Sequence, residues 1–283
     1  MSNLADRVTP ALLRSWELPD PGESKKSRGR VAVVGGSILS PGAVMLAGEA
    51  ALRVGAGLAT LMVPAELAVP MGVALPEAGV CRLPPAGEDL PAGARGELEA
   101  AQTVLVGPGL ADPEETRDRV ERVAAASAVP LLLDAFALGV LPDLDRATLP
   151  ADLVLTPNRE EAALLLGEEE TDADPPAVAE IARRYRAVVS CYGYIAEPDG
   201  QVWEVPRGGP GLGTSGSGDV LSGAIAGFLA RSVRPAEAAV WGTWLHTRAG
   251  NRLTARVGIG FLARDIAREL TPSLAETIGH PLV

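Results

Sequence analysis

The chain has 283 residues and carries 25 basic against 36 acidic side chains, a formal net charge of −11, which argues against nucleic-acid binding through a basic surface. Its only lysines, Lys25 and Lys26, lie side by side in a polar run at 23–30. A P-loop needs a lysine inside a glycine-rich turn, and a pyridoxal enzyme needs a buried lysine. Neither chemistry is expected of this chain.

The composition is that of a globular protein with a small-residue core. Apolar residues make up 47% and aromatic residues only 4%, so the core must be built mainly from Ala, Val and Leu. Two cysteines, Cys81 and Cys191, are too few for a disulfide framework or a zinc pattern, and we expect free thiols. Residues 1–10 carry early charges, and no stretch of about 20 apolar residues lacks charge. We therefore expect neither a secretory signal nor a membrane span, and a cytoplasmic location.

Short apolar segments alternate with helical patterns along the chain. We expect strands at 31–34, 58–63, 103–106, 131–133, 153–155, 187–190, 194–197 and 202–205. We expect helices at 11–16, 43–54, 114–127, 160–166, 218–231, 236–255 and 262–270. This alternation predicts an α/β fold, a mostly parallel central sheet between two helical layers, with an antiparallel hairpin near Asp199-Gly200. The stretch 84–99 is too short to separate domains, so we expect one domain over residues 1–283.

Small or polar residues follow four of the expected strands. They are Gly35-Gly36-Ser37, Gly107-Pro108-Gly109, Asp134 and Thr156-Pro157-Asn158. Each alone is an ordinary turn from a strand into a helix, but together they favour one cleft at the carboxyl ends of parallel strands. Asn158 is followed three residues later by Glu161, a spacing typical of a helix cap with a reciprocal acidic partner.

The segment 211–223 is the most informative. Glycines at 213, 216 and 218 let the backbone approach a ligand closely, and the helix that follows adds the positive end of its dipole. This arrangement suits a phosphate group. Asp219 then falls in the first helical turn, where a carboxylate can take a proton from an attacking hydroxyl. The simpler interpretation, an acidic residue that favours the helix dipole, accounts for Asp219 but not for the interleaved glycines and hydroxyl residues.

Three other residues have two open interpretations. His246 lies in an apolar helical segment, where a histidine more often serves packing than catalysis, and so few histidines make a His-based nucleophile triad unexpected. Cys191 and Tyr192 interrupt a strand region, where they either line a pocket or pack in the core.

With these motifs in order, the sequence resembles a known enzyme family. The glycine-rich segment is similar to that of the ribokinase-like superfamily. The ordered set of Gly35-Gly36-Ser37, Gly55-Ala56-Gly57, 106–110, 133–135, 155–157 and 211–223 resembles the ADP-dependent NAD(P)H-hydrate dehydratases. The resemblance covers about residues 10–270, and from the length of 283 residues we expect a stand-alone dehydratase rather than a bifunctional member with an epimerase domain. It implies a ribokinase-like fold and a cofactor-repair hydro-lyase, in which a nucleotide phosphorylates the hydroxyl of hydrated NADH or NADPH and phosphate then leaves.

The resemblance also assigns roles to residues. Asp219 would be the catalytic base and would contact the substrate. The other contacts to the hydrated cofactor would come from Ala43, Gly107, Gly109 and Asn158, and those to the nucleotide from Gly216, Ser217 and Gly218. ADP, preferred over ATP, would be the co-substrate with Mg²⁺, although no side chain is assigned as a metal ligand. Family members tend to be homo-oligomers, often tetramers, and no nucleic-acid or membrane partner is expected.

The chain departs from the family pattern at three places. Asn158 stands where the family's Thr-Pro-His-Pro-Gly-Glu has histidine, and Phe136 replaces the second carboxylate of Leu-Asp-Ala-Asp-Ala-Leu. The family's Lys-Gly-Ala-x-Thr segment falls near 189–193 and is not reproduced. These departures bear on the nucleotide contacts and keep two alternatives open. One is a ribokinase-like kinase of a sugar or vitamin alcohol, and the other is a degenerate nucleotide-binding member without turnover.

Overall fold

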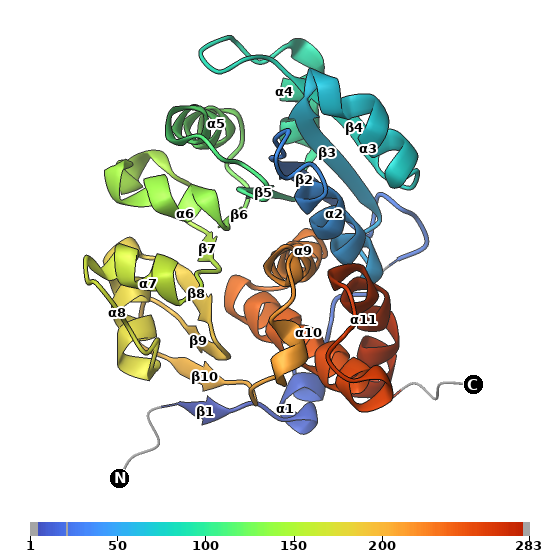
Figure 1. Ribbon diagram of the computed structural model, residues 1–283, viewed down its shortest axis with the longest axis vertical. Coiled ribbons are helices and arrows are strands. Elements are labelled where there is room, and N and C mark those ends of the chain that lie inside the picture. The colour runs from blue at the N-terminus through green and yellow to red at the C-terminus, as the bar shows by residue number, and fades with distance from the viewer. Residues whose placement is uncertain (1–4, 21, 280–283) are drawn as a thin grey trace.

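The computed structural model describes residues 5–20 and 22–279. Its described strands form one sheet of ten, in the order β1-β10-β9-β8-β7-β6-β5-β2-β3-β4 (Figure 1). Their bounds are β1 Asp6–Arg7, β2 Arg30–Val34, β3 Leu58–Pro64, β4 Gly79–Leu83, β5 Thr103–Val106, β6 Leu131–Leu133, β7 Leu153–Leu155, β8 Val188–Cys191, β9 Tyr194–Ala196 and β10 Val202–Glu204. The seven strands from β4 to β8 in this order pair in parallel, and β9 is antiparallel to both β8 and β10.

Helices cover both faces of the sheet. Their bounds are α1 Pro10–Ser15, α2 Ala43–Arg53, α3 Ala68–Ala74, α4 Ala92–Ala100, α5 Pro113–Ala126, α6 Phe136–Val140, α7 Arg159–Leu166, α8 Pro175–Tyr185, α9 Ser217–Ala230, α10 Pro235–Val257 and α11 Ala263–Ile278. One apolar core joins the sheet to α2, α3, α9, α10 and α11, and a second joins it to α4 through α8. The two groups lie on opposite sides of the sheet in Figure 1. The expected three-layer, mostly parallel architecture is confirmed.

The alternation of side chains along a strand explains the two cores. In β2, Val31 and Val33 face the core of α2 and α9, whereas Ala32 and Val34 face the other. All four side chains are fully buried, as expected for a central strand of a parallel sheet. The core side chains are mostly Ala, Val and Leu, as the composition predicted.

The structure adds elements that the sequence patterns did not indicate, and it corrects one. The strands β1 and β4 and the helices α3, α4, α6 and α8 were not expected, and α11 continues to Ile278 through Pro272 rather than ending at 270. The residues thought to interrupt a strand region do not do so: Cys191 ends β8, and Tyr192-Gly193 form the two-residue hairpin turn into β9. Both turn residues have positive φ, 49° and 91°, as such hairpins require. The expected hairpin at Asp199-Gly200 joins β9 to β10.

The helices α2 and α9 pack unusually closely. A Cβ atom on Gly223 would lie 2.2 Å from the carbonyl oxygen of Ala47, and one on Gly227 would lie 2.7 Å from that of Ala51. Both distances are shorter than van der Waals contact, so only glycine fits at 223 and 227 without a shift of the backbone. This contact sets the position of the amino end of α9 relative to α2.

Across the two described stretches, none of the helices has the length and apolar character that a membrane crossing requires.

The close contact predicts a specific loss of stability. We expect Gly223→Ala to lower the free energy of unfolding by about 1–3 kcal/mol, because the added methyl group overpacks the helix pair. Gly96→Ala is the matched control, since this exposed position in α4 has open space around it. There the same change should add about 0.5–1 kcal/mol through helix propensity. Urea unfolding of both variants measures this, and equal effects at the two positions would contradict the packing argument.

Candidate active site

The carboxyl ends of the central strands meet as the sequence predicts. The amide of Gly36 donates to the carbonyl of Pro108 at 2.8 Å, and the amide of Gly107 donates to that of Val34 at 3.1 Å. One strand further along, the amide of Asp134 donates to the carbonyl of Val106, also at 3.1 Å. The turns after β2, β5 and β6 therefore form one continuous edge.

Two glycines of the turn after β5 cannot carry a side chain. Gly107 has φ of 132°, and a Cβ there would lie 1.8 Å from the carbonyl oxygen of Asp134. Gly109 has φ of 74°, and its Cβ would lie 3.1 Å from that of Ala43 and 2.4 Å from the carbonyl oxygen of Ser40. The structure thus places Gly109 beside Ala43, at the start of α2. Their contacts with the hydrated cofactor remain a prediction.

The glycine-rich segment leads into α9 as expected. Gly216 is the residue before the helix and has φ of 86°, and Ser217, Gly218 and Asp219 form the first turn. The first amides of a helix have no partner within it and are available to an anion, although that of Ser217 already donates to the carbonyl of Thr214 at 3.1 Å. A Cβ on Gly216 would lie 2.5 Å from the side chain of Leu46, which places this turn against α2. The arrangement is suited to phosphate, as predicted.

The carboxyl group of Asp219 is half-buried, and its pKa is raised to about 7. Burial, which disfavours the charged form, is the larger cause, and the nearby carboxylate of Asp134 is the second. A group with a pKa near neutrality can accept a proton and release it again at physiological pH. The environment of Asp219 therefore fits a general base.

Asp134 is a functional candidate whose role the sequence did not reveal. It follows β6, is 5% exposed, and its Oδ1 accepts a 2.7 Å hydrogen bond from the hydroxyl of Thr156, at the end of β7. Burial raises its pKa to about 6, although hydrogen bonds from Ser222 and Thr156 lower it in part. Ser222 also donates to the backbone carbonyl of Asp219 at 3.2 Å. Asp134 thereby connects two strand ends to the first turn of α9.

Asn158 caps α7, as its spacing from Glu161 predicts. Its Oδ1 accepts from the amide of Glu161 at 2.9 Å, and a carboxylate oxygen of Glu161 accepts from the amide of Asn158 at 2.8 Å. The pKa of Glu161 is raised to about 7, first by burial and then by Asp134 and Glu160. The cap uses the side-chain oxygen of Asn158 and leaves its side-chain NH₂ group for a ligand. That ligand contact remains a prediction.

His246 does more than pack. It is buried in α10, and its Nε2 lies 2.9 Å from the hydroxyl oxygen of Ser217 in the glycine-rich turn. Burial lowers its pKa to about 4, so the ring is neutral at physiological pH. A neutral imidazole in this place can hold the Ser217 hydroxyl without adding charge to the glycine-rich turn.

The positions that depart from the family pattern have separate roles. Phe136 begins α6 and is partly exposed. Cys191 is buried, and burial raises the pKa of its thiol to about 12, so it packs rather than reacts. Tyr192 is half-exposed in the hairpin turn, with the guanidinium of Arg159 4.5 Å from its ring centre. Lys25 and Lys26 are exposed, as expected, and take no place in this edge of the sheet.

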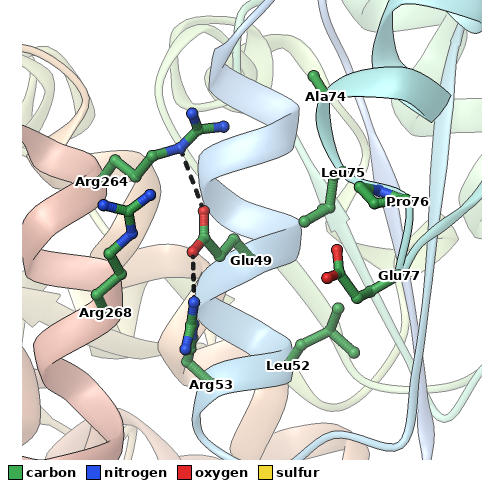
Figure 2. Close-up of a pocket in the computed structure, with 9 residues that line it drawn as sticks. All are labelled: Glu49, Leu52, Arg53, Ala74, Leu75, Pro76, Glu77, Arg264 and Arg268. Carbon is green, nitrogen blue, oxygen red and sulfur yellow. Dashed lines mark hydrogen bonds and ion pairs between the residues drawn. The ribbon is translucent and has the colours of Figure 1, made fainter.

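A groove of about 420 Å³ lies elsewhere, over α2 between α11 and residues 74–77 (Figure 2). Three of its charged groups are paired with one another: Glu49 contacts Arg53 at 3.1 Å and Arg264 at 3.4 Å. Residues 74–77 lead into the amino end of β4, so this groove lies away from the carboxyl ends of the strands. Its residues tie α2 to α11 and include none of the candidate site residues.

In the part of the chain that the structure describes, no group of three or more His, Cys, Asp or Glu side chains is arranged to hold a metal ion. Mg²⁺ differs from most metals in this respect, because it is commonly bound by one or two carboxylates together with substrate phosphates.

Comparison with known proteins agrees with this geometry. The family model described as NAD(P)H-hydrate dehydratase matches residues 31–272. An ADP-dependent (S)-NAD(P)H-hydrate dehydratase of Xanthomonas campestris is 46% identical over 275 residues, which cover 93% of this chain and 94% of the relative. The crystal structure of the Bacillus subtilis ADP/ATP-dependent NAD(P)H-hydrate dehydratase, co-crystallized with ATP/Mg²⁺, superimposes with a TM-score of 0.85 and 25% identity, covering 98% of this chain and 100% of that one.

Arabidopsis thaliana ribokinase shares the fold alone, with a TM-score of 0.59 and 13% identity over 87% of this chain and 98% of the ribokinase. The family match and the 46% identical relative go further than the fold. The chain therefore belongs to the NAD(P)H-hydrate dehydratase family.

Proposed function

We propose that the protein restores hydrated NADH and NADPH to the reduced cofactors in a nucleotide-dependent dehydration, with ADP preferred over ATP. The observation that carries this proposal is Asp219, a half-buried carboxyl group with a pKa near 7 at the amino end of α9. The family membership of the chain and the names of its relatives support the substrate and the donor.

The chemistry follows from what surrounds the carboxylate. Asp219 takes the proton of the ring hydroxyl as that oxygen attacks the terminal phosphorus of the nucleotide. The bond between the terminal phosphorus and the oxygen that bridges it to AMP breaks, so AMP leaves and the ring carries a phosphate ester. The ring then expels inorganic phosphate and loses a proton, which restores the double bond. The net change is hydrated cofactor plus ADP to cofactor, AMP, phosphate and one proton.

Phosphate binding rests on the backbone in this proposal. Lys25 and Lys26 are the only lysines, and both are exposed outside the site, so no lysine serves the nucleotide. The turn of Gly216, Ser217 and Gly218 binds the nucleotide phosphates instead, through the amides of Gly216 and Gly218 and the hydroxyl of Ser217, which the neutral His246 orients. Ala43, Gly107, Gly109 and Asn158 contact the hydrated cofactor.

The site fits a magnesium ion that is held partly by the nucleotide. Neither Glu161 nor Asp134 forms an ion pair with a basic side chain of the described residues, and burial is the largest cause of the raised pKa of each. Either one with nucleotide phosphates makes the kind of site that Mg²⁺ occupies. When bound, the ion supplies neutralisation of the charge on the transferring phosphoryl group.

The remaining expectations are part of the same proposal. Residues 1–283 form one domain, which the single sheet through the described strands supports. The protein works in the cytoplasm as a homo-oligomer, most simply a tetramer by analogy with the family. Its partners are the hydrated dinucleotide and the nucleotide.

The activity is tested directly by adding the protein to hydrated NADH with Mg²⁺ and either ADP or ATP. We expect the absorbance of the reduced ring to return with both donors, and faster with ADP. A kinase of another small alcohol, or a protein without turnover, would give no recovery with either donor, and that result would overturn the proposal.

Asp219→Asn tests the base. We expect it to lower kcat by about a hundredfold or more, the range typical of a lost general base, while nucleotide binding persists. Asp199→Asn, in the exposed turn between β9 and β10, is the matched control and should keep full activity. If the Asp219→Asn variant turned over at the wild-type rate, Asp219 would have no role as the base.

The raised pKa values also predict how stability depends on pH. Asp134, Glu161 and Asp219 hold protons up to about pH 6–7 when folded, whereas in the unfolded chain they lose them near pH 4. The folded state therefore binds more protons over this window, and the free energy of unfolding falls as pH rises through it. We expect Asp219→Asn to be more stable than the wild type at about pH 8, with a smaller difference at about pH 5. Urea unfolding at both values measures this, and a difference independent of pH would contradict it.

A further inference from the structure

Arg159 is an exposed cation without a charged partner at the carboxyl edge of the sheet. It begins α7, directly after Asn158, and Figure 1 shows this helix beside β7 and β8. Its side chain forms neither an ion pair nor a hydrogen bond with any residue of the ranges 5–20 and 22–279. Its guanidinium carbon instead lies 4.5 Å from the ring centre of Tyr192, in the hairpin turn after β8. The positive charge of Arg159 is therefore available to a ligand.

The local position of Arg159 gives it no structural reason to be a cation. The amino end of a helix is the positive end of its dipole, so a basic residue is unfavourable there and an acidic one is favourable. Glu160 and Glu161, which follow in the same turn, obey this rule, and Arg159 breaks it. A residue that conflicts with its local surroundings and gains no ion pair is typical of a functional position.

The contact with Tyr192 holds the guanidinium in a useful place. A guanidinium that packs on an aromatic ring is attracted by the ring face. The N–H groups lie in the plane of the guanidinium and stay free, and they can grip two phosphate oxygens at once. Tyr192 itself is fixed by the two-residue turn, in which its φ is 49°. The turn thereby presents Arg159 as a preformed phosphate ligand.

The glycine-rich turn lies close to the same strand end. The hydroxyl of Ser190, the third residue of β8, lies 2.8 Å from that of Thr243 on α10. His246 stands three residues further along α10 and contacts Ser217 of the glycine-rich turn. Residues three apart on a helix are neighbours on one face. A single turn of α10 therefore connects the end of β8 to the segment proposed to bind the nucleotide phosphates.

The end of β8 also lacks a cation of its own. The lysine of the family's Lys-Gly-Ala-x-Thr has no counterpart near 189–193, whereas Arg159 stands in the place of the second proline of Thr-Pro-His-Pro-Gly-Glu. The charge of Arg159 reaches this strand end: burial and Glu161 raise the pKa of the Cys191 thiol, and Arg159 lowers it. A positive charge is thus missing from one strand end and present on the neighbouring helix.

We propose that Arg159 binds the phosphates of the nucleotide donor, in the role for which this chain has no lysine. The inference rests on the proposed function, because it takes the donor to lie at the glycine-rich turn. The hydrated dinucleotide carries phosphates as well, but Gly107 and Gly109, which are proposed to hold it, follow β5. Strands lie about 4.8 Å apart, so the end of β5 is roughly 14 Å from that of β8. The position of Arg159 therefore favours the donor.

Arg159→Gln tests the proposal by calorimetric titration with ADP and Mg²⁺, which needs no turnover. We expect the Kd for ADP to rise about tenfold or more, the usual effect of losing a hydrogen bond to a charged group. The KM for ADP should rise in step, and the KM for hydrated NADH should stay unchanged. Arg159→Lys keeps the charge and loses the planar fork, so its Kd should lie between those of the wild type and Arg159→Gln.

Two comparisons separate binding from structure. The thermal transition of Arg159→Gln should stay close to that of the wild type, because the unfavourable helix dipole and the favourable ring contact are both removed. Arg95→Gln is the matched control, since Arg95 is exposed on α4 and its side chain has no ion pair or hydrogen bond within the described ranges. It should leave the Kd for ADP and both KM values unchanged.

The outcomes distinguish this proposal from the proposed function. An unchanged Kd for ADP in Arg159→Gln would overturn the role of Arg159, and so would a rise in the KM for hydrated NADH alone. A wild-type protein that binds ADP but restores no reduced cofactor would overturn the proposed function. The Kd comparison would still decide whether Arg159 binds the nucleotide.

Discussion

The close contact between α2 and α9 is the constraint on which the rest of the site depends. Gly223 and Gly227 let α9 lie against the backbone of α2 at Ala47 and Ala51. The amino ends of both helices then arrive at the carboxyl edge of the sheet, one with the residues beside Gly109 and the other with Asp219. A single added methyl group at the contact would separate the proposed base from the segment proposed to receive the substrate.

The carboxyl edge of the sheet also carries an electrostatic cost that function can use. Burial raises the pKa of three carboxyl groups, those of Asp134, Glu161 and Asp219. The charge of Asp134 further raises the pKa of the other two. Only hydrogen bonds, such as that from Thr156 to Asp134, offset part of this cost. Active sites commonly carry such destabilising groups, because a carboxylate that is fully solvated or ion-paired is a poor base at neutral pH. In the described chain the cationic complement would come with the nucleotide and its metal ion.

Much of the central sheet could be predicted, because its strands are apolar in sequence and are also buried in the structure. The strands 103–106, 131–133 and 153–155 are short apolar runs in the middle of a parallel sheet, and the structure confirms their bounds. The strand β4 escaped notice because it lies at the edge and has mostly partly exposed side chains. The helix α3 contains Pro70 and Gly72, and α8 begins with two prolines, so both read as loops from composition alone.

The parts of the site that depend on residues close together in the sequence could be predicted, and those that depend on contacts between distant residues could not. The glycine-rich turn, Asp219 and the Asn158 cap each depend on residues within a few positions. The bond from Thr156 to Asp134 joins residues 22 apart, and that between Ser217 and His246 joins residues 29 apart. Arg159 looks like an ordinary surface residue at the start of a helix, and only the fold shows that it lies over the hairpin turn after β8.

The central claim is that Asp219 is a base whose pKa is set by burial and by Asp134. The most direct measurement is the pH dependence of kcat for hydrated NADH with ADP, in the wild type and in Asp134→Asn. The account predicts a fall in activity below about pH 7 in the wild type, because Asp219 then gains a proton. It predicts that the fall moves to lower pH in Asp134→Asn, since one cause of the raised pKa is removed. An activity that does not change across this range, or a fall at the same pH in both proteins, would contradict the account.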